Sequence, residues 1–268
     1  ENAEAGYKGI ELGPFGFMPE DPAILADALA EHDQELIGGV VFRPFHDPAK
    51  WDEVMDASIR TCKALAAHGA KHLVLIDSIS ERRAPTAGRA DDAEQMSNAE
   101  WTVFRDRIAQ VAKMGTEEYG LTVGIHAHAA GFMDFEPELI RLLDEVDENH
   151  LKICFDTGHH SYAGFDPISF MESYISRISY MHFKDINPVV KADVLAKGTG
   201  FYDACGQGIF SNLGDGDVNL PRVREILIKN NFEGWCTVEQ DCDPTLPDTD
   251  ALGDAKINRA YLQSIGFS

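Results

Sequence analysis

Histidine and carboxylate side chains stand at the ends of several short apolar runs in this sequence. The segments GIHAH, FDTGHH, MHFKD and VEQD each close such a run. Imidazole and carboxylate groups that converge from neighbouring strands suit Mn²⁺, Co²⁺, Fe²⁺, Mg²⁺ or Zn²⁺, whereas a thiolate site would need clustered cysteines. We therefore predict that Asp156, His182 and Glu239 bind a divalent metal ion.

Other polar residues end the remaining apolar runs. A lone aspartate at such a place is usually a turn former or a helix cap, so the coincidence on four successive strands favours a site. Residues two apart on a strand face the same way, so one member of a pair can hold metal while the other touches substrate. The further candidates are Glu11, Arg43, His46, Asp77, His126, His128, His159, Lys184, Asp185 and Asp241.

Lys184 stands two residues after a predicted metal ligand. An ammonium near a metal and a carboxylate would have a lowered pKa and could act as a general acid or base. The alternative is a plain salt bridge to Asp185 or another acid. His159 is either a site residue or a helix-start histidine bonded to backbone, and His160 is expected to be its surface neighbour.

Two glycine-rich segments have weaker interpretations. Phe15 and Phe17 in GPFGF could wall a substrate pocket or pack on the surface. The segment 206–217, GQGIFSNLGDGD, lacks the lysine and helix start of a P-loop and does not fit GxGxxG, so nucleotide binding is excluded.

Strand-like and helix-like segments alternate along the chain. Strands are predicted at 7–12, 35–42, 72–76, 121–128, 151–156, 178–183 and 234–239. Helices are predicted at 22–32, 51–68, 99–119, 137–146, 167–176, 221–230 and 254–265, several of them opening on proline.

This alternation predicts one (β/α)8 barrel over residues 1–268. Seven strands are visible, so the first strand is apparently missing, and residues 1–5 read as the tail of a helix. The long connections 77–97 and 184–218 stand where barrel enzymes keep substrate-covering loops.

The composition excludes some partners. A formal charge of −22 would repel nucleic acid and anionic lipid. Five cysteines without a CxxC pair favour a reducing cytoplasm, and neither a membrane span nor a secretory signal is visible.

The motifs AGYKGIELG, GIHAHAAG, CFDTGHHSYAGFDP, ISYMHFKD, GDGDVNLPRV and GWCTVEQD resemble the xylose-isomerase-like TIM-barrel superfamily. The resemblance runs from about Gly6 to the C-terminus, and within the superfamily it is to the inosose dehydratases. It implies that a first strand precedes AGYKGIELG. It also implies a metal site of Glu, Asp, His and Glu from the last four strands, of which Asp156, His182 and Glu239 match three.

The fifth-strand position departs from that pattern, because GIHAHAAG offers histidine where many relatives have Glu. His126 is preferred over His128 as the fourth ligand, and Asp134 or Glu136 could reach back instead. Mn²⁺ or Co²⁺ is expected first, with Zn²⁺, Fe²⁺ or Mg²⁺ as alternatives.

The resemblance implies dehydration of a cyclic polyol ketone such as 2-keto-myo-inositol, in inositol catabolism. Lys184 and either His128 or His159 would supply acid and base, while Glu11, Phe15, His46, Asp77 and Asp241 would contact substrate. The alternatives are a ketose isomerase or epimerase, and a non-catalytic protein or a subunit of a glycoside-cleaving complex. A homo-oligomer is compatible with each of these functions. The negative charge opposes the DNA endonuclease activity known in the superfamily.

Overall fold

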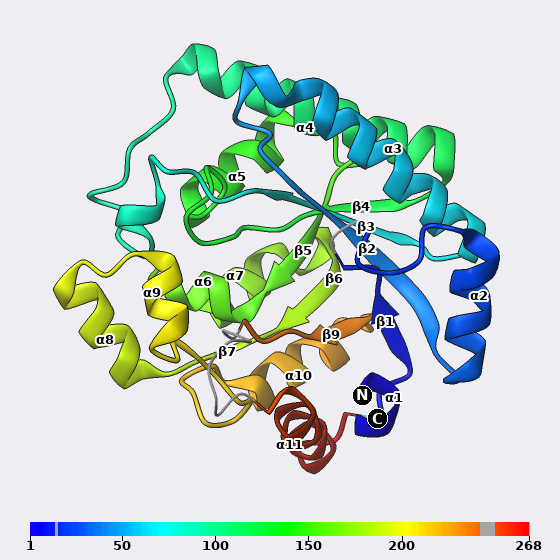
Figure 1. Ribbon diagram of the computed structural model, residues 1–268. Helices are drawn as coiled ribbons and strands as arrows, with labels where there is room; N and C mark the ends of the chain where they lie inside the picture. The colour runs from blue at the N-terminus through cyan, green and yellow to red at the C-terminus, as the bar shows by residue number, and fades with distance from the viewer. Residues whose placement is uncertain (14–15, 242–249, 268) are drawn as a thin grey trace.

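Seven parallel strands form one sheet whose order follows the chain (Figure 1). The computed structural model describes residues 1–13, 16–241 and 250–267. The strands are β1 (Gly9–Glu11), β2 (Glu35–Arg43), β3 (His72–Asp77), β4 (Thr122–Ile125), β5 (Lys152–Asp156), β6 (Ile178–Phe183) and β9 (Cys236–Val238). Each lies within or beside a predicted strand, so all seven predictions are confirmed.

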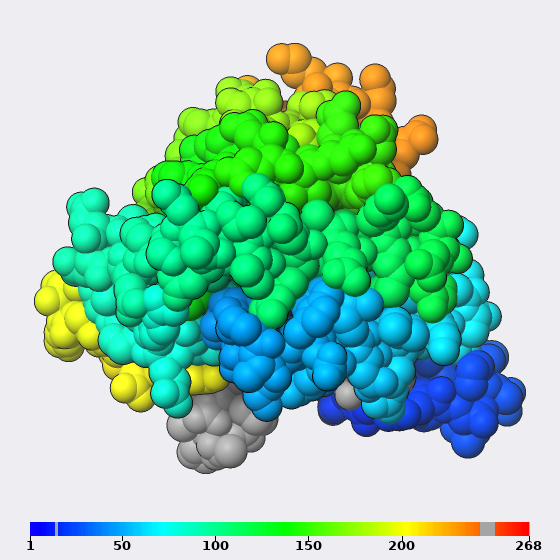
Figure 2. Space-filling model, turned by 90° about the horizontal axis from the view of Figure 1, so that it is seen from above, coloured from blue at the N-terminus to red at the C-terminus, as the bar shows by residue number. Residues whose placement is uncertain are grey.

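Helices surround this sheet (Figure 1). They are α1 (Asn2–Ala5), α2 (Pro22–Glu31), α3 (Trp51–His68), α4 (Asn98–Tyr119), α5 (Glu136–Glu145), α6 (Thr157–Tyr162), α7 (Pro167–Tyr174), α8 (Pro188–Lys197), α9 (Phe201–Gly206), α10 (Leu220–Lys229) and α11 (Ala251–Ser264). Short 3₁₀ turns occupy Pro48–Lys50, Ala84–Thr86 and Ile175–Arg177. Viewed from above, the side chains of consecutive segments from α3 to α5 cover one face in chain order (Figure 2).

Helix starts follow local chemistry. The Asp21 side chain accepts the amides of Ala23 and Ile24, and Pro22 opens α2. Asp166 plays the same part at α7, where its side chain accepts the amide of Ile168. Proline suits the first turn because its missing N–H would have no intrahelical partner there. The predicted helix positions are confirmed, and no end differs from its prediction by more than three residues.

The strands bury both of their faces. Leu73 and Leu75 of β3 belong to the core shared with the helices, whereas Val74 joins Cys154 and Tyr180 in a separate cluster on the other face. Alternate residues of a strand point to opposite faces, so Asp156 and His182 continue the faces of Cys154 and Tyr180. The candidate ligands thus lie at the carboxyl ends of the strands, above the barrel interior.

The sheet is open between β1 and β9. Among the described residues no strand pairs with both of these edges, which agrees with the predicted absence of the first barrel strand. A cavity of about 740 Å³ lies there, lined by Gly9, Ile37, Trp235 and Cys236 among others. Figure 1 shows both chain ends beside this opening, next to α1 and α11.

The long connection 184–218, predicted to stand where barrel enzymes keep substrate-covering loops, has secondary structure of its own. It contains α8, α9 and a small antiparallel pair, β7 (Asp185–Ile186) with β8 (Phe210–Ser211). Ile186, Phe201 and Phe210 form a buried cluster with Tyr162 of α6. Because this apolar cluster is packed on the barrel, the connection forms a fixed wall beside the candidate site.

Candidate metal centre

Four side chains at neighbouring strand ends form what we call the first cluster: His126, Asp156, His182 and Glu239. Asp156 pairs in register with His182 across β5 and β6, and the amide of Glu239 donates to the carbonyl of Phe183 over 3.1 Å. These backbone bonds hold the strand ends at one level. Each residue offers one ligand atom, and these atoms lie within 4.8 Å of one another.

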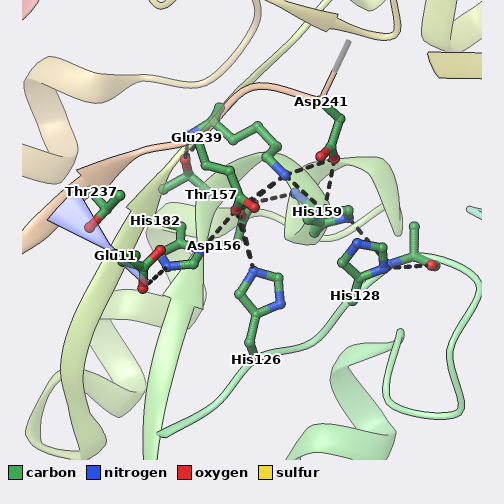
Figure 3. A network of polar contacts seen from close by, with 12 residues as sticks. Glu11, His126, His128, Asp156, Thr157, His159, His182, Thr237, Glu239 and Asp241 are labelled. Carbon is green, nitrogen blue, oxygen red and sulfur yellow. Dashed lines mark hydrogen bonds and ion pairs between the residues drawn. The ribbon is translucent and has the colours of Figure 1, made fainter. Parts of the chain in front are cut away.

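Three residues of the first cluster, His126, Asp156 and His182, are buried, and close polar contacts join the cluster across strands (Figure 3). Nδ1 of His182 lies 2.8 Å from Oε2 of Glu239, and Nε2 of His126 lies 3.4 Å from Oδ2 of Asp156. The side chain of Glu239 is 36% exposed, whereas those of the other three are almost fully buried. One side of the cluster therefore remains open to a ligand.

The hydrogen bonding of this cluster is incomplete. In the described part of the chain, neither ring nitrogen of His126 nor Oδ2 of Asp156 has a hydrogen-bond partner. Buried polar atoms without partners are rare, and each calls for a physical explanation. Two imidazoles and two carboxylates are ligands that divalent transition metals accept, so the four residues fit such an ion.

The competing candidates for the fourth ligand, which follow β4, lie outside this cluster. His128 is outside the first cluster, Oδ2 of Asp134 accepts the amide of Ala130 over 3.0 Å, and Glu136 lies 3.1 Å from Nε2 of His160. Of the four alternatives for the fourth ligand, His126 has the position that completes the set.

Four more residues, two or three positions further along the same strand ends, form the second cluster: His128, His159, Lys184 and Asp241. Nζ of Lys184 lies 3.0 Å from Nε2 of His159 and 2.9 Å from Oδ2 of Asp241. Rings of Phe201 and Phe210 pack against the two histidines. The second cluster, of which Figure 3 labels His128, His159 and Asp241, thus has one apolar wall.

The expected lowering of the Lys184 pKa is wrong. Burial by itself would lower this pKa, but the carboxylates of Asp241, Glu239 and Asp156 together raise it above its ordinary value. Nζ lies 3.4 Å from Glu239 and 3.7 Å from Asp156. Lys184 is therefore a firmly held ammonium. The alternative partner, Asp185, accepts backbone amides of Gly214, Gly216 and Val218 instead.

The two histidines of the second cluster favour the neutral form. Burial lowers the pKa of His128 far below its usual value, and the charges of His159 and His126 lower it further. Burial also lowers the pKa of His159, as does the ammonium of Lys184. A buried neutral imidazole beside an ammonium provides a proton acceptor and a proton donor in one site.

Two residues that the sequence interpretation passed over position Lys184. The hydroxyl of Thr157 donates to the Lys184 carbonyl over 2.7 Å and accepts the Lys184 amide over 3.1 Å. A Cβ on Gly158 would lie 2.6 Å from Cγ of Lys184, so only glycine allows this approach. The FDTGHH motif contains both residues, but their contact with β6 depends on the fold.

Glu11 lies behind the first cluster. Its Oε1 is 3.3 Å from Nε2 of His182, the nitrogen opposite the one that faces Glu239. A carboxylate in this place fixes the ring and makes a histidine a better metal ligand.

The other predicted substrate contacts are spread around the mouth. The carboxylate of Asp77 is buried and bonds Nδ1 of His46 over 2.8 Å and the amide of Phe132 over 2.9 Å. Phe17 is 81% exposed, and the prediction for Phe15 lies outside the described residues. His160 is buried, with a pKa that burial lowers to about 4, so the surface position expected for it is wrong.

The fold and the strand-end ligands match a known family. Residues 1–265 match the family described as xylose isomerase-like TIM barrel. This chain belongs to that family. The resemblance seen in its motifs is thereby confirmed, and so is the predicted barrel.

Relatives with curated names include inosose dehydratases. The chain is 28% identical over 251 residues to the one from Clostridium botulinum, covering 92% of this chain and 82% of the relative. It is 29% identical over 270 residues to the one from Mesomycoplasma hyopneumoniae, covering 99% of this chain and 86% of the relative.

Solved structures share the fold at low identity. The probable 3-DHS dehydratase AsbF from Bacillus anthracis gives a TM-score of 0.73 at 18% identity, covering 98% of this chain and 90% of that one. The IOLI protein with a bound zinc atom gives 0.75 at 15% identity, with the same coverage. An L-ribulose 3-epimerase gives 0.71 at 15% identity, covering 98% and 85%. Within the described residues, no helix is both long and apolar enough to cross a membrane.

Proposed function

We propose that this protein is a metal-dependent dehydratase that removes water from a cyclic polyol ketone such as 2-keto-myo-inositol. The observation that carries the proposal is the pairing of the two clusters. A set of four metal ligands with unsatisfied buried atoms lies directly beside an ammonium and two neutral histidines. The inosose dehydratase names of the curated relatives support the choice of substrate.

His126, Asp156, His182 and Glu239 would hold the ion, with Mn²⁺ or Co²⁺ expected first. When bound, a divalent ion would polarise the substrate ketone and stabilise the negative charge that develops on its oxygen. The zinc in the IOLI structure supports a divalent metal in this family without deciding which ion acts here.

The second cluster would move the protons. A neutral histidine, His128 or His159, accepts the proton from the carbon next to the ketone. The ammonium of Lys184 donates a proton to the departing hydroxyl on the next carbon, so the C–O bond breaks and water leaves. The raised pKa keeps Lys184 protonated and the lowered pKa keeps His128 neutral, so each group is in the protonation state that its role requires. Asp241, bonded to Lys184, would orient the ammonium.

Substrate contacts by Glu11, Phe15, His46 and Asp77 remain predictions. Of the predicted substrate-contact residues, Asp241 lies in the second cluster and Glu11 touches a proposed metal ligand. A small polyol without nucleic-acid or membrane partners suits a chain of net charge −22. We also propose that it acts in the cytoplasm in inositol catabolism, a reducing compartment that suits a sequence of five cysteines without a CxxC pair. A homo-oligomer is compatible with this proposal.

The test is turnover of 2-keto-myo-inositol by protein loaded with Mn²⁺ or Co²⁺. The expected product is lighter than the substrate by one water and absorbs in the ultraviolet, and a chelator should abolish its formation. If the mass stays unchanged while a new sugar appears, the protein is an epimerase or isomerase; the compared L-ribulose 3-epimerase shares its fold. If no divalent ion binds and added metals give no turnover, a non-catalytic role is favoured.

A further inference from the structure

The second cluster contains metal-ligating groups that the proposed chemistry does not use as ligands. His128, His159 and Asp241 each offer a ligand atom, and these atoms lie within 4.8 Å of one another. We propose that these three residues form a second cation site that the Lys184 ammonium fills, so that a chain without this ammonium binds a second divalent ion there. The inference rests on the metal centre of the proposed function.

The position of the ammonium supports the proposal. Nζ of Lys184 is within 3.0 Å of both Nε2 of His159 and Oδ2 of Asp241. A divalent ion binds imidazole nitrogen and carboxylate oxygen at about 2.0–2.2 Å. An ion between these two atoms would need the space that Nζ occupies, so the ammonium and the ion exclude each other.

The histidines present the lone pairs that an ion needs. Nδ1 of His128 lies 2.8 Å from the carbonyl of Ala129 and donates to it, so Nε2 is left as the acceptor. His159 faces two donors, the Ala129 amide at 3.2 Å and Lys184 at 3.0 Å, although a neutral ring has one lone pair. The shorter, charge-assisted contact is the stronger one and places the lone pair on Nε2.

The surrounding charges also favour a cation at this place. The Lys184 ammonium lies 2.9 Å from Asp241, 3.4 Å from Glu239 and 3.7 Å from Asp156. Removing the ammonium takes this cation away from three carboxylates, of which Asp156 is fully buried and Asp241 and Glu239 are part-buried. Because an uncompensated buried charge is costly, the vacated place attracts another cation.

The test measures the number of metal ions bound per chain and needs no substrate. Wild type, Lys184→Met and Lys184→Gln are loaded with excess Mn²⁺, freed of unbound ion by gel filtration, and analysed by inductively coupled plasma mass spectrometry. We expect one ion per wild-type chain and two per Lys184→Met or Lys184→Gln chain. Electron paramagnetic resonance should show a spin-coupled Mn²⁺ pair in the variants and an isolated ion in wild type.

Two controls separate this result from general loss of charge. Lys191 is also part-buried and donates to the carbonyl of Ser161 over 2.5 Å, so Lys191→Met removes an ammonium outside the second cluster and should keep one ion. The double variant Lys184→Met/His159→Ala lacks a ligand and should return to one ion. Circular dichroism checks that each variant is folded.

The proposal is overturned if folded Lys184→Met and Lys184→Gln both bind one ion or none, or if wild type binds two. It is equally overturned if the double variant keeps two ions. Failure of the dehydratase proposal appears in a different assay, as absent turnover of 2-keto-myo-inositol by wild type that contains its one ion.

Discussion

The first and second clusters arise from the same four strand ends, and only the second contains a lysine. The first has His126, Asp156, His182 and Glu239, and the second follows two or three residues later with His128, His159, Lys184 and Asp241. Where the first cluster has the imidazole of His182, the second has the ammonium of Lys184. In the first, neither ring nitrogen of His126 nor Oδ2 of Asp156 has a hydrogen-bond partner among the described residues, while in the second an ammonium bonds both a histidine nitrogen and a carboxylate oxygen.

Under the proposed function, this difference assigns Lewis-acid chemistry to the first cluster and proton transfer to the second. Parallel strands in register bring equivalent positions to one level, so each step of two residues produces a new layer of side chains. Lys184 supplies the second cluster with its own positive charge. His182, at the corresponding place in the first cluster, leaves room for a metal ion.

The largest expected effect comes from breaking the first cluster. His182→Ala removes one of four ligands, so we expect loss of the bound ion and a fall in kcat/KM for 2-keto-myo-inositol of about 10³-fold. Metal analysis and steady-state kinetics measure both effects. The matched variant Asp241→Asn in the second cluster should keep its ion. Equal metal content in His182→Ala and wild type would contradict the assigned ligand set.

A smaller effect is expected from displacing the ammonium of the second cluster. In Gly158→Ala the new Cβ would lie 2.6 Å from Cγ of Lys184, so the lysine must shift. Misplacement of a reacting group by about 1 Å can cost roughly 10²-fold, and we expect kcat to fall by that order while the metal stays bound. Gly206→Ala is the control, because a Cβ there meets nothing within 4 Å. An unchanged kcat in Gly158→Ala would show that Lys184 does not act in the reaction.

A third variant tests whether the carboxylate of Glu11 strengthens metal binding by His182. Glu11→Gln keeps the size of the side chain that contacts His182 but removes its charge, so metal affinity should weaken about 10–100-fold. Calorimetric titration of metal-free protein with Mn²⁺ measures this. Glu136→Gln, at the comparable contact with His160, should leave metal affinity unchanged. If both variants bind metal like wild type, Glu11 does not position the ligand.

The smallest effect concerns the loop after β4, which carries His128 of the second cluster. Burial raises the pKa of Asp134 to about 7, and this residue bonds the amide of Ala130 near His128. Its unfolded pKa is about 3.9, so the folded state binds the extra proton between about pH 4 and pH 7. Stability from this group is present below that window and is lost as pH rises through it, by at most about 1.4 kcal/mol per pH unit. Urea unfolding at about pH 5 and pH 7 should show a smaller difference for Asp134→Asn than for wild type. Identical differences would contradict the raised pKa.

The sequence predicted which residues stand at the strand ends, because each of them closes an apolar run that can be recognised locally. Each of Asp156, His182 and Glu239 ends its own apolar run, and parallel strands must bring such ends together. The sequence favoured His126 only slightly over His128 as the fourth ligand, because residues two apart on a strand face the same way. Only the position of the loop after β4 separates them.

Errors arose where the answer depended on residues distant in the chain. The pKa of Lys184 was predicted to fall, but Asp241 and Glu239, more than fifty residues later, raise it. The helices α8 and α9 were missed in a segment that reads as a loop, because their support comes from Tyr162 and Ile186 in other elements. The contact of Gly158 with Lys184 joins the start of α6 to the residue after β6, so neither sequence motif alone reveals it.

Anomalous X-ray scattering from crystals of the Co²⁺-loaded wild-type protein tests the division between the two clusters most directly. The account predicts a single strong anomalous peak per chain, enclosed by His126, Asp156, His182 and Glu239, with the Lys184 side chain still bonded to His159 and Asp241. A peak among His128, His159 and Asp241 in the wild type, or no peak at the first cluster, would contradict it.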